Sequence, residues 1–143
     1  MIVCKFGGRS VADTDQIAKV RGIVESEPKR RLIVVSAPGK RTKEDEKITD
    51  LLYRCHEEAS GGGDYSETFA KIRERFRDIA AGLGAGGSMD ADLEEVERRI
   101  GDEETPDYAA SRGEFLSAKL LSACLGAEFI DAEDVVRLTE DGR

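Results

Sequence analysis

The first segment with residues suited to chemistry is a glycine pair that follows a short apolar run. Gly7 and Gly8 come directly after residues 2–6, with Lys5 shortly before the pair and Ser10 shortly after it. Glycines permit close backbone approach, helix N-terminal amides point toward anions, and a lysine ammonium can neutralise charge on a transferred phosphoryl group. A tight turn beside an exposed strand-end lysine would have the same pattern, so both interpretations stay open. The segment matches neither a Walker loop nor a Gly-x-Gly-x-x-Gly fingerprint.

Two hydroxyls and one carboxylate further along the chain could contact a small charged substrate. Ser36 ends a second apolar run, and Thr49 lies in the first turn of a predicted helix. Glu114 follows Gly113 inside an otherwise apolar helical segment. A glycine there costs about 1 kcal/mol relative to alanine, so close approach of a ligand or another backbone would be a reason to keep it. The alternatives are turn or helix-start hydroxyls and a solvated or salt-bridged glutamate.

A strand–helix–strand unit is predicted to position these residues. Residues 2–6 and 31–36 are β-rich runs, each ended by a glycine-containing turn. Between them, apolar residues recur at helical spacing behind Asp13, and Gln16 lies at the capping-box position. A crossover of this length joins parallel strands, and continuous apolar strands favour cover on both faces, so we expect the sheet to lie between helical layers.

The candidate residues should therefore gather at one edge of the sheet. Ligands of open α/β sheets bind beyond the carboxyl ends of the strands. The residues placed there by the pattern are Lys5, Gly7, Gly8, Ser10 and Ser36. We also predict a third strand at residues 127–131.

The rest of the chain is predicted to be helical. Apolar residues recur at steps of three and four, and glycine-rich segments or a Thr-Pro pair separate the runs. The predicted helices cover residues 48–59, 65–83, 89–100 and 106–124. The second and third form a helical hairpin at about 64–100, with antiparallel packing.

Composition and charge exclude several classes of protein. The 143 residues carry a net charge of −8, and the acidic excess lies in residues 61–143, which hold 10 basic and 20 acidic side chains. Without a basic stripe the chain would repel a phosphate backbone, so we expect no nucleic-acid partner. No run approaches the roughly 20 apolar residues of a membrane span, and no secretory segment is evident, so we expect a cytoplasmic protein with no membrane partner.

The cysteines do not indicate a disulfide framework or a metal centre. There are three, widely spaced, and the chain has one histidine. No Cys-x-x-Cys pair is present, so we predict no zinc site and no metal-ligating residue.

Four motifs, in this order, resemble those of the aspartokinases. They are residues 5–11 (Lys-Phe-Gly-Gly-x-Ser-Val), 34–40 (Val-Val-Ser-Ala-Pro-Gly-Lys), 48–52 (Ile-Thr-Asp-Leu-Leu) and 111–117 (Ser-Arg-Gly-Glu-Phe-Leu-Ser). The resemblance implies an α/β three-layer sandwich with a mostly parallel sheet, the amino-acid kinase (carbamate kinase-like) fold, present as its N-terminal portion. It also implies ATP-dependent phosphorylation of the side-chain carboxylate of L-aspartate, the first step toward lysine, threonine and methionine, with ATP and Mg²⁺ as cofactors.

The resemblance also assigns a role to each matching residue. Lys5 is similar to the lysine that stabilises the transferring phosphoryl group. Gly7, Gly8 and Ser10 resemble the loop on the phosphate side. Ser36, Thr49 and Glu114 resemble aspartate contacts, and Glu114 would meet the α-ammonium.

Two departures from the family pattern bear on activity. Arg9 stands where the family usually has Thr or Ser, so a cation beside the phosphate path either binds phosphate or blocks it. Family members also continue into a nucleotide half and regulatory ACT domains. We therefore expect the isolated chain to show little or no kinase activity, and exposed core surface to allow association into a homo-oligomer.

Three alternatives stay open at this point. Another amino-acid kinase, acting on glutamate, acetylglutamate or a nucleotide, fits the motifs at 34–40 and 111–117 less well. A non-catalytic amino-acid-binding or interaction module derived from such a kinase is favoured by Arg9 and by the missing half. A dinucleotide-binding domain lacks its glycine fingerprint.

Overall fold

Two parallel strands form the sheet. A computed structural model of the chain describes residues 1–102 and 105–137. It pairs β1 (Ile2–Phe6) with β2 (Arg30–Val35), and Lys5 lies beside Val34 in the register. Helix α1 (Thr14–Glu25) connects the strands, and the Asp13 carboxylate caps it by accepting a hydrogen bond from the Gln16 backbone N–H at 2.9 Å. The predicted strand–helix–strand unit and the α/β class with a parallel sheet are confirmed.

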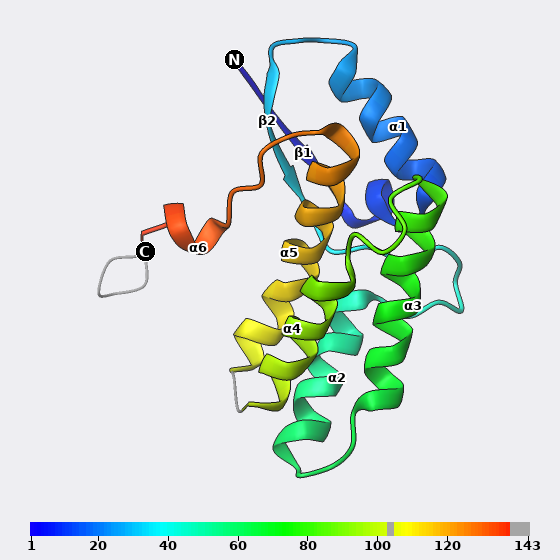
Figure 1. Cartoon of the computed structure of the whole chain (residues 1–143), viewed down its shortest axis with the longest axis vertical. Helices are drawn as coiled ribbons and strands as arrows, with labels where there is room; N and C mark the ends of the chain where they lie inside the picture. Colours follow the sequence, from blue (N-terminus) through cyan, green and yellow to red (C-terminus); the bar gives the residue numbers. More distant parts are fainter. Residues whose placement is uncertain (103–104, 138–143) are drawn as a thin grey trace.

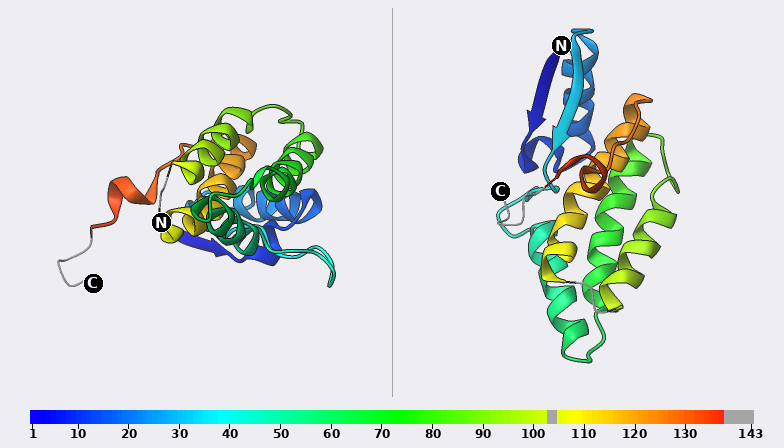
Figure 2. Two further views of the ribbon diagram at one scale, coloured as in Figure 1. Left: turned by 90° about the horizontal axis from the view of Figure 1, so that it is seen from below. Right: turned by 90° about the vertical axis from the view of Figure 1, so that its left-hand side faces the viewer.

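The two faces of the sheet differ in their cover. Phe6 and Ile33 face inward and pack against the core together with buried Val35. On the other face Val3 is 60% and Val34 50% exposed. Helix α1 runs along one side of the strands while the bundle lies beyond their carboxyl ends (Figure 2). Within the described residues, helical cover is thus present on one face and the other face is open.

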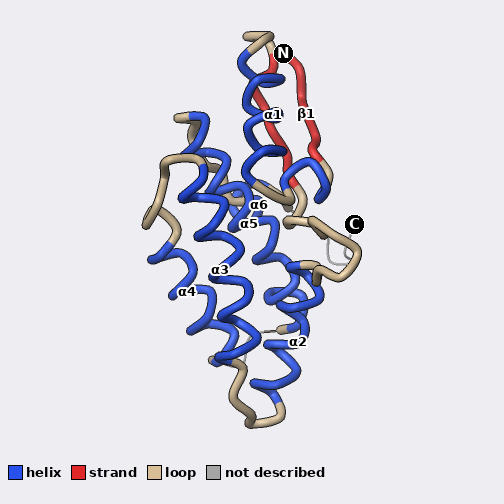
Figure 3. Tube along the Cα trace, turned by 90° about the vertical axis from the view of Figure 1, so that its right-hand side faces the viewer, coloured by secondary structure: helices blue, strands red, loops and turns tan. Residues whose placement is uncertain are grey.

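Four helices form a bundle that contains most of the core (Figures 1 and 3). They are α2 (Ile48–Ser60), α3 (Ser66–Gly82), α4 (Asp90–Gly101) and α5 (Pro106–Leu125). Each presents an apolar stripe to the others, and the bundle's interior side chains include Leu52, Phe69, Phe76 and Leu93, all 0% exposed. Helix α2 packs against both α3 and α5, and α4 packs mainly against α2 and α5. No helix of the described ranges is long and apolar enough to span a membrane.

The prediction of a third strand at residues 127–131 is wrong. The structure places no strand there, and the described part of the chain has a two-stranded sheet. A strand needs a hydrogen-bonded partner, but this segment pairs with neither β1 nor β2, and its Phe129 ring packs edge-on against Phe115 of α5 with centroids 5.4 Å apart. The short helix α6 (Ala132–Val135) then begins behind Asp131, whose side chain accepts a hydrogen bond from the Glu133 backbone.

Candidate functional site

The loops that follow the two strands meet backbone to backbone. The Gly39 N–H donates to the Gly8 carbonyl at 2.9 Å, and the Ser36 N–H donates to the Phe6 carbonyl at 3.0 Å. A Cβ on Gly8 would lie 2.8 Å from the Ala37 carbonyl oxygen, and one on Gly39 would lie 2.9 Å from the Gly8 carbonyl carbon. Because no side chain fits between the two loops, both positions require glycine. Gly8 and Gly39 therefore permit the close approach of the two loops, whereas a Cβ on Gly7 would meet nothing within 4 Å.

The glycine segment itself is a short helical turn. Gly7 precedes the 3₁₀ helix η1 (Gly8–Val11), and the Ser10 N–H donates to the Gly7 carbonyl at 2.9 Å. This turn leads directly to the capped start of α1. The chain after β1 is thus a rigid corner at the carboxyl edge of the sheet.

Helix α5 contacts the same edge at Gly113 and Glu114. A Cβ on Gly113 would lie 2.6 Å from the Cβ of Ala37 and 3.4 Å from a methyl of Leu52. The close approach predicted for this helix-interior glycine is therefore made by the Ala37 side chain. One residue on, the Glu114 Oε1 accepts a hydrogen bond from the Ala37 N–H at 3.2 Å. Glu114 is exposed, so its carboxylate can also meet a ligand at the rim.

The remaining candidate residues border the same edge. The Ile48 N–H lies 3.5 Å from the Pro38 carbonyl, which brings the start of α2, and Thr49 with it, to the loop after Ser36. Lys5 is exposed on the open face of β1, opposite Val34 in the register. The 36–39 loop thus joins one rim that includes Gly7, Gly8, Ser36, Thr49 and Glu114. Lys5 lies on β1 just before this rim, one residue from Phe6, whose carbonyl bonds the Ser36 N–H.

A basic hollow lies beside this rim. Its volume is about 600 Å³, and it lies between the η1–α1 corner and the loop after Gly39. Four of its lining residues are cationic, one is acidic and three are uncharged: Arg9, Lys40, Arg41 and Lys43; Asp13; Ala12, Gln16 and Thr42. In a chain with net charge −8 this is a local concentration of positive charge.

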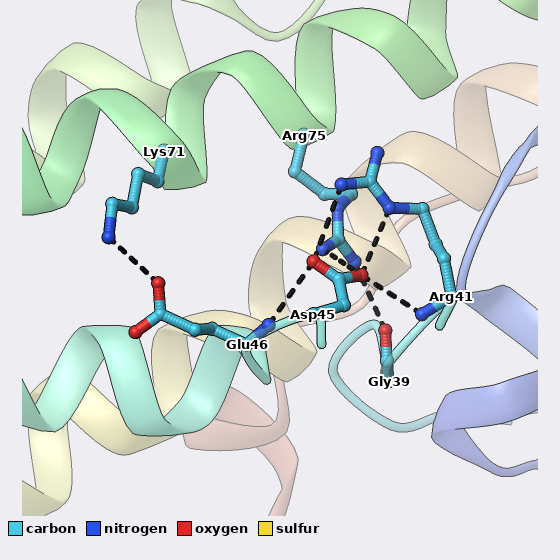
Figure 4. Close-up of polar contacts among 6 residues, drawn as sticks. All are labelled: Gly39, Arg41, Asp45, Glu46, Lys71 and Arg75. Atoms are coloured by element: carbon cyan, nitrogen blue, oxygen red, sulfur yellow. Dashed lines mark hydrogen bonds and ion pairs between the residues drawn. The ribbon is translucent and has the colours of Figure 1, made fainter. Parts of the chain in front are cut away.

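A buried ion pair fixes the loop that carries these cations (Figure 4). The Arg75 side chain of α3 is 4% exposed, donates to the Gly39 carbonyl at 3.1 Å, and pairs with the Asp45 carboxylate. Arg41 bonds the same carboxylate through its backbone N–H at 2.9 Å and its Nε at 3.0 Å. The loop between Gly39 and Asp45 is therefore held at both ends by one arginine.

Charge and burial act in opposite directions on Asp45. Burial by itself would raise the pKa of Asp45, but the hydrogen bonds from Arg41 and the charge of Arg75 outweigh burial and hold that pKa well below its usual range. The carboxylate is therefore ionised at neutral pH and remains paired with both guanidinium groups. Next to it, Glu46 pairs with Lys71 at 2.8 Å and with Arg54 at 2.7 Å, which adds a second link from this loop to α2 and α3.

The donor set does not fit a metal ion held by the protein alone. Across residues 1–102 and 105–137, no group of three or more His, Cys, Asp or Glu side chains converges. Magnesium is commonly bound through substrate phosphates with one or two carboxylates.

Sequence patterns predicted neither the basic hollow nor the Arg75–Asp45 ion pair that holds its loop. The run Lys40-Arg41-Thr42-Lys43 is visible in the sequence, but its relation to Arg9 appears only when the two loops meet in space. Arg75 lies on α3 between Glu74 and Phe76, and nothing in its spacing shows that it reaches Gly39.

Comparison with known proteins gives the chain a family context. The model of the amino acid kinase family matches residues 1–142. Among curated proteins, the chain is 38% identical over 144 residues to aspartokinase 3 of Bacillus subtilis, covering 94% of this chain and 31% of that protein. It is 31% identical to an aspartokinase of Chlamydia muridarum, covering 94% and 29%. The chain spans about a third of the length of these relatives.

Solved structures agree on the fold. The aspartate kinase of Clostridium acetobutylicum superposes with a TM-score of 0.92 at 44% identity, covering 94% of this chain and 31% of that one. E. coli aspartokinase III, solved in complex with aspartate and ADP, superposes with a TM-score of 0.69 at 28% identity, covering 88% and 29%. The strand–helix–strand unit and the bundle are thus arranged as in enzymes of this kind.

Proposed function

This chain belongs to the amino acid kinase family, and from that premise we propose that it is the aspartate-side portion of an aspartate kinase. The reaction would transfer the γ-phosphoryl group of ATP to the side-chain carboxylate of L-aspartate, early in the biosynthesis of lysine and related amino acids. The observation that carries this proposal is the meeting of all four aspartokinase-like motifs at one edge of the sheet. Gly8 contacts the 36–39 loop, and Gly113 and Ile48 contact the same loop.

The proposed roles follow from the chemistry of each group. Glu114 would bind the α-ammonium of aspartate, because one carboxylate oxygen already bonds the Ala37 N–H and orients the group at the rim. Ser36 and Thr49 would donate hydrogen bonds to the carboxylates of the bound aspartate. Lys5 would neutralise the charge that develops on the transferring phosphoryl group.

This set of residues suits a carboxylate acceptor. A side-chain carboxyl with an ordinary pKa near ~4 is ionised at neutral pH, so it needs no general base to become a nucleophile. Positioning and charge neutralisation are then sufficient. The described rim accordingly offers hydroxyls, a glutamate and a lysine.

Binding of L-aspartate is the first test. Calorimetric titration of the chain should give saturable binding that weakens about tenfold or more in Glu114→Gln, since a hydrogen bond to a charged group contributes about 1.5–3 kcal/mol. Glu94→Gln on the exposed face of α4 is the matched control and should bind like wild type. Equal binding by both variants would refute the role of Glu114.

Turnover is tested in the longest polypeptide that the gene encodes. Trapping of the acyl phosphate with hydroxylamine should show preference for L-aspartate over L-glutamate and UMP. Lys5→Met should lower kcat by about 10²–10³ without changing aspartate affinity, because the lysine acts on the transition state. Aspartate binding without any turnover would favour the non-catalytic binding module, and preference for another acceptor would exclude aspartate kinase.

A further inference from the structure

The residues proposed to contact aspartate lie around one irregular segment of the chain. Residues 36–47 connect β2 to α2 without a helix or strand, Ser36 begins this segment, and Thr49 lies in the helix turn directly after it. Glu114 bonds the same segment at the Ala37 N–H. The relative position of these side chains therefore depends on the conformation of the 36–47 segment. Affinity for a small ligand is higher when such a conformation is ordered before binding.

The 36–47 segment is held by a side chain from a helix that supplies none of the proposed contact residues. Arg75 of α3 donates to the Gly39 carbonyl at 3.1 Å and pairs with the Asp45 carboxylate (Figure 4). Residues 40–44, between these two positions, are all exposed. One guanidinium thus connects the exposed part of the segment to the helical bundle.

Helix α3 is itself firmly placed. Its Phe69 and Phe76 side chains are fully buried in the bundle. At its carboxyl end, a Cβ on Gly82 would lie 2.4 Å from the Thr14 Oγ1, so α3 also packs closely against the start of α1. Arg75 therefore extends from a helix whose position is fixed by both the bundle and the strand–helix–strand unit.

The bundle does not require a charge at this position. Arg75 is 4% exposed, burial lowers its pKa, and its Nε has no hydrogen-bond partner among the described residues. Burial of an ion pair carries a desolvation cost, and well-packed apolar side chains often stabilise a core equally well or better. The α3 residues that pack beside it in the bundle, Ile72, Phe76 and Ile79, are apolar. The ion pair is therefore better explained by the geometry that it gives to the 36–47 segment than by stability.

We propose that Arg75 is a positioning residue of the aspartate site, which acts from α3 through the 36–47 segment. It would touch neither the substrate nor the reacting atoms. Its bonds to Gly39 and Asp45 hold the segment in the conformation in which Ser36, Thr49 and Glu114 bind L-aspartate. The inference rests on the proposed function, which assigns aspartate to this rim. Loss of Arg75 should therefore weaken aspartate binding even when the chain remains folded.

Aspartate affinity of folded variants tests this role. In calorimetric titration of the chain, with folding checked by circular dichroism, Arg75→Met should bind aspartate about tenfold more weakly than wild type, because the segment must be ordered on binding. Arg75→Lys keeps a charge beside Asp45 but lacks a fork for two acceptors, so it should recover only part of the affinity. Phe76→Leu is the matched control, because it lowers stability at the next residue of α3 and should bind aspartate like wild type.

A double variant separates positioning from stability. Asp45→Asn alone leaves Arg75 buried without its charged partner, so the combination of Arg75→Met with Asp45→Asn should be more stable in urea than Asp45→Asn. Its aspartate affinity should nevertheless stay about tenfold below wild type, because the segment has lost its bonds to α3. In the longest polypeptide that the gene encodes, Arg75→Met should raise the KM for aspartate about tenfold and change kcat by less than about threefold.

Three results would each overturn the positioning role. They are wild-type affinity in Arg75→Met, an equal loss of affinity in Phe76→Leu, and recovery of affinity together with stability in the double variant. Weaker binding in Glu114→Gln with normal binding in Arg75→Met would refute the positioning role and leave the proposed function intact.

Absence of aspartate binding in wild type would instead refute the proposed function. Amide hydrogen exchange of residues 39–45 without ligand then tests the role of Arg75 in the segment. Faster exchange in Arg75→Met than in Phe76→Leu would support that role, and equal exchange in the two variants would remove it.

Discussion

The helical bundle and the strand ends are held together by different interactions. In the bundle, Phe69, Phe76 and Leu93 are fully buried, and helix faces exclude water from their apolar stripes. In the sheet, Val3 and Val34 remain at least half exposed. The bundle thus supplies most of the buried apolar surface, which is the main favourable contribution to folding.

The strand ends instead depend on backbone geometry and charge. Their contacts are the Gly8–Gly39 hydrogen bond, the Ala37–Gly113 approach and the Arg75–Asp45 pair. Each of these joins a loop to another loop or to a helix of the bundle. The bundle thus stabilises the chain, and this stability allows the rim to hold exposed polar groups in place.

Truncation of the bundle core should have the largest effect on stability. Phe76→Ala removes a fully buried ring and should lower the free energy of unfolding by about 3–5 kcal/mol. Val34→Ala on the open face of the sheet should cost less than about 1 kcal/mol, because the side chain is half exposed. Urea unfolding followed by circular dichroism measures both, and similar losses would contradict the division of roles.

The buried ion pair should make the stability of the rim depend on pH in the acid range, whereas the apolar bundle core should not. Because the folded pKa of Asp45 is lowered, its stabilising effect is complete above the unfolded value of about 4 and is lost as pH falls below it. Asp45→Asn should therefore destabilise the chain by about 2–3 kcal/mol at pH 7, since it leaves Arg75 buried without its charged partner.

The difference between wild type and Asp45→Asn should then shrink as the pH falls below about 4, in urea midpoints measured at several pH values. Asp50→Asn, at an exposed carboxylate of α2, controls for the general loss of acidic charge. A gap that stays constant through the acid range would show that Asp45 stabilises the loop without its charge.

A methyl group added at Gly8 should destabilise the chain, whereas one added at the adjacent Gly7 should not. In Gly8→Ala the new methyl lies 2.8 Å from the Ala37 carbonyl oxygen, so the loops must part at a cost of about 1–2 kcal/mol. Gly7→Ala meets nothing within 4 Å and has an ordinary φ of −77°, so it should be nearly neutral. If aspartate binding weakens in Gly8→Ala but not in Gly7→Ala, the loop contact supports the proposed site. If both variants bind aspartate equally well, the loop contact does not contribute to that site.

Local patterns could predict the elements but only part of the site. Asp13 and Thr105 are capping residues that act within three positions of themselves, so the starts of α1 and α5 follow from sequence. Parallel pairing follows from the length of the crossover. The strand predicted at 127–131 fails because pairing needs a distant edge, whereas the Phe129–Phe115 contact is available nearby. Arg75 was missed for the same reason, because its role arises from contacts between segments more than 30 residues apart, such as Arg75 with Gly39.

The smallest expected effect has the opposite sign and concerns the helix that covers the sheet. Gly22 lies inside α1, is exposed, and a Cβ there would meet nothing within 4 Å. Gly22→Ala should therefore raise the free energy of unfolding by about 0.5–1 kcal/mol, because alanine restricts the unfolded chain and fits the helix without strain. Urea unfolding measures this gain. If the sheet and α1 unfold together with the bundle, the whole transition shifts. If Gly22→Ala instead slows amide hydrogen exchange in β1 and β2 but not in the bundle, the two regions unfold separately and thus differ in cooperativity.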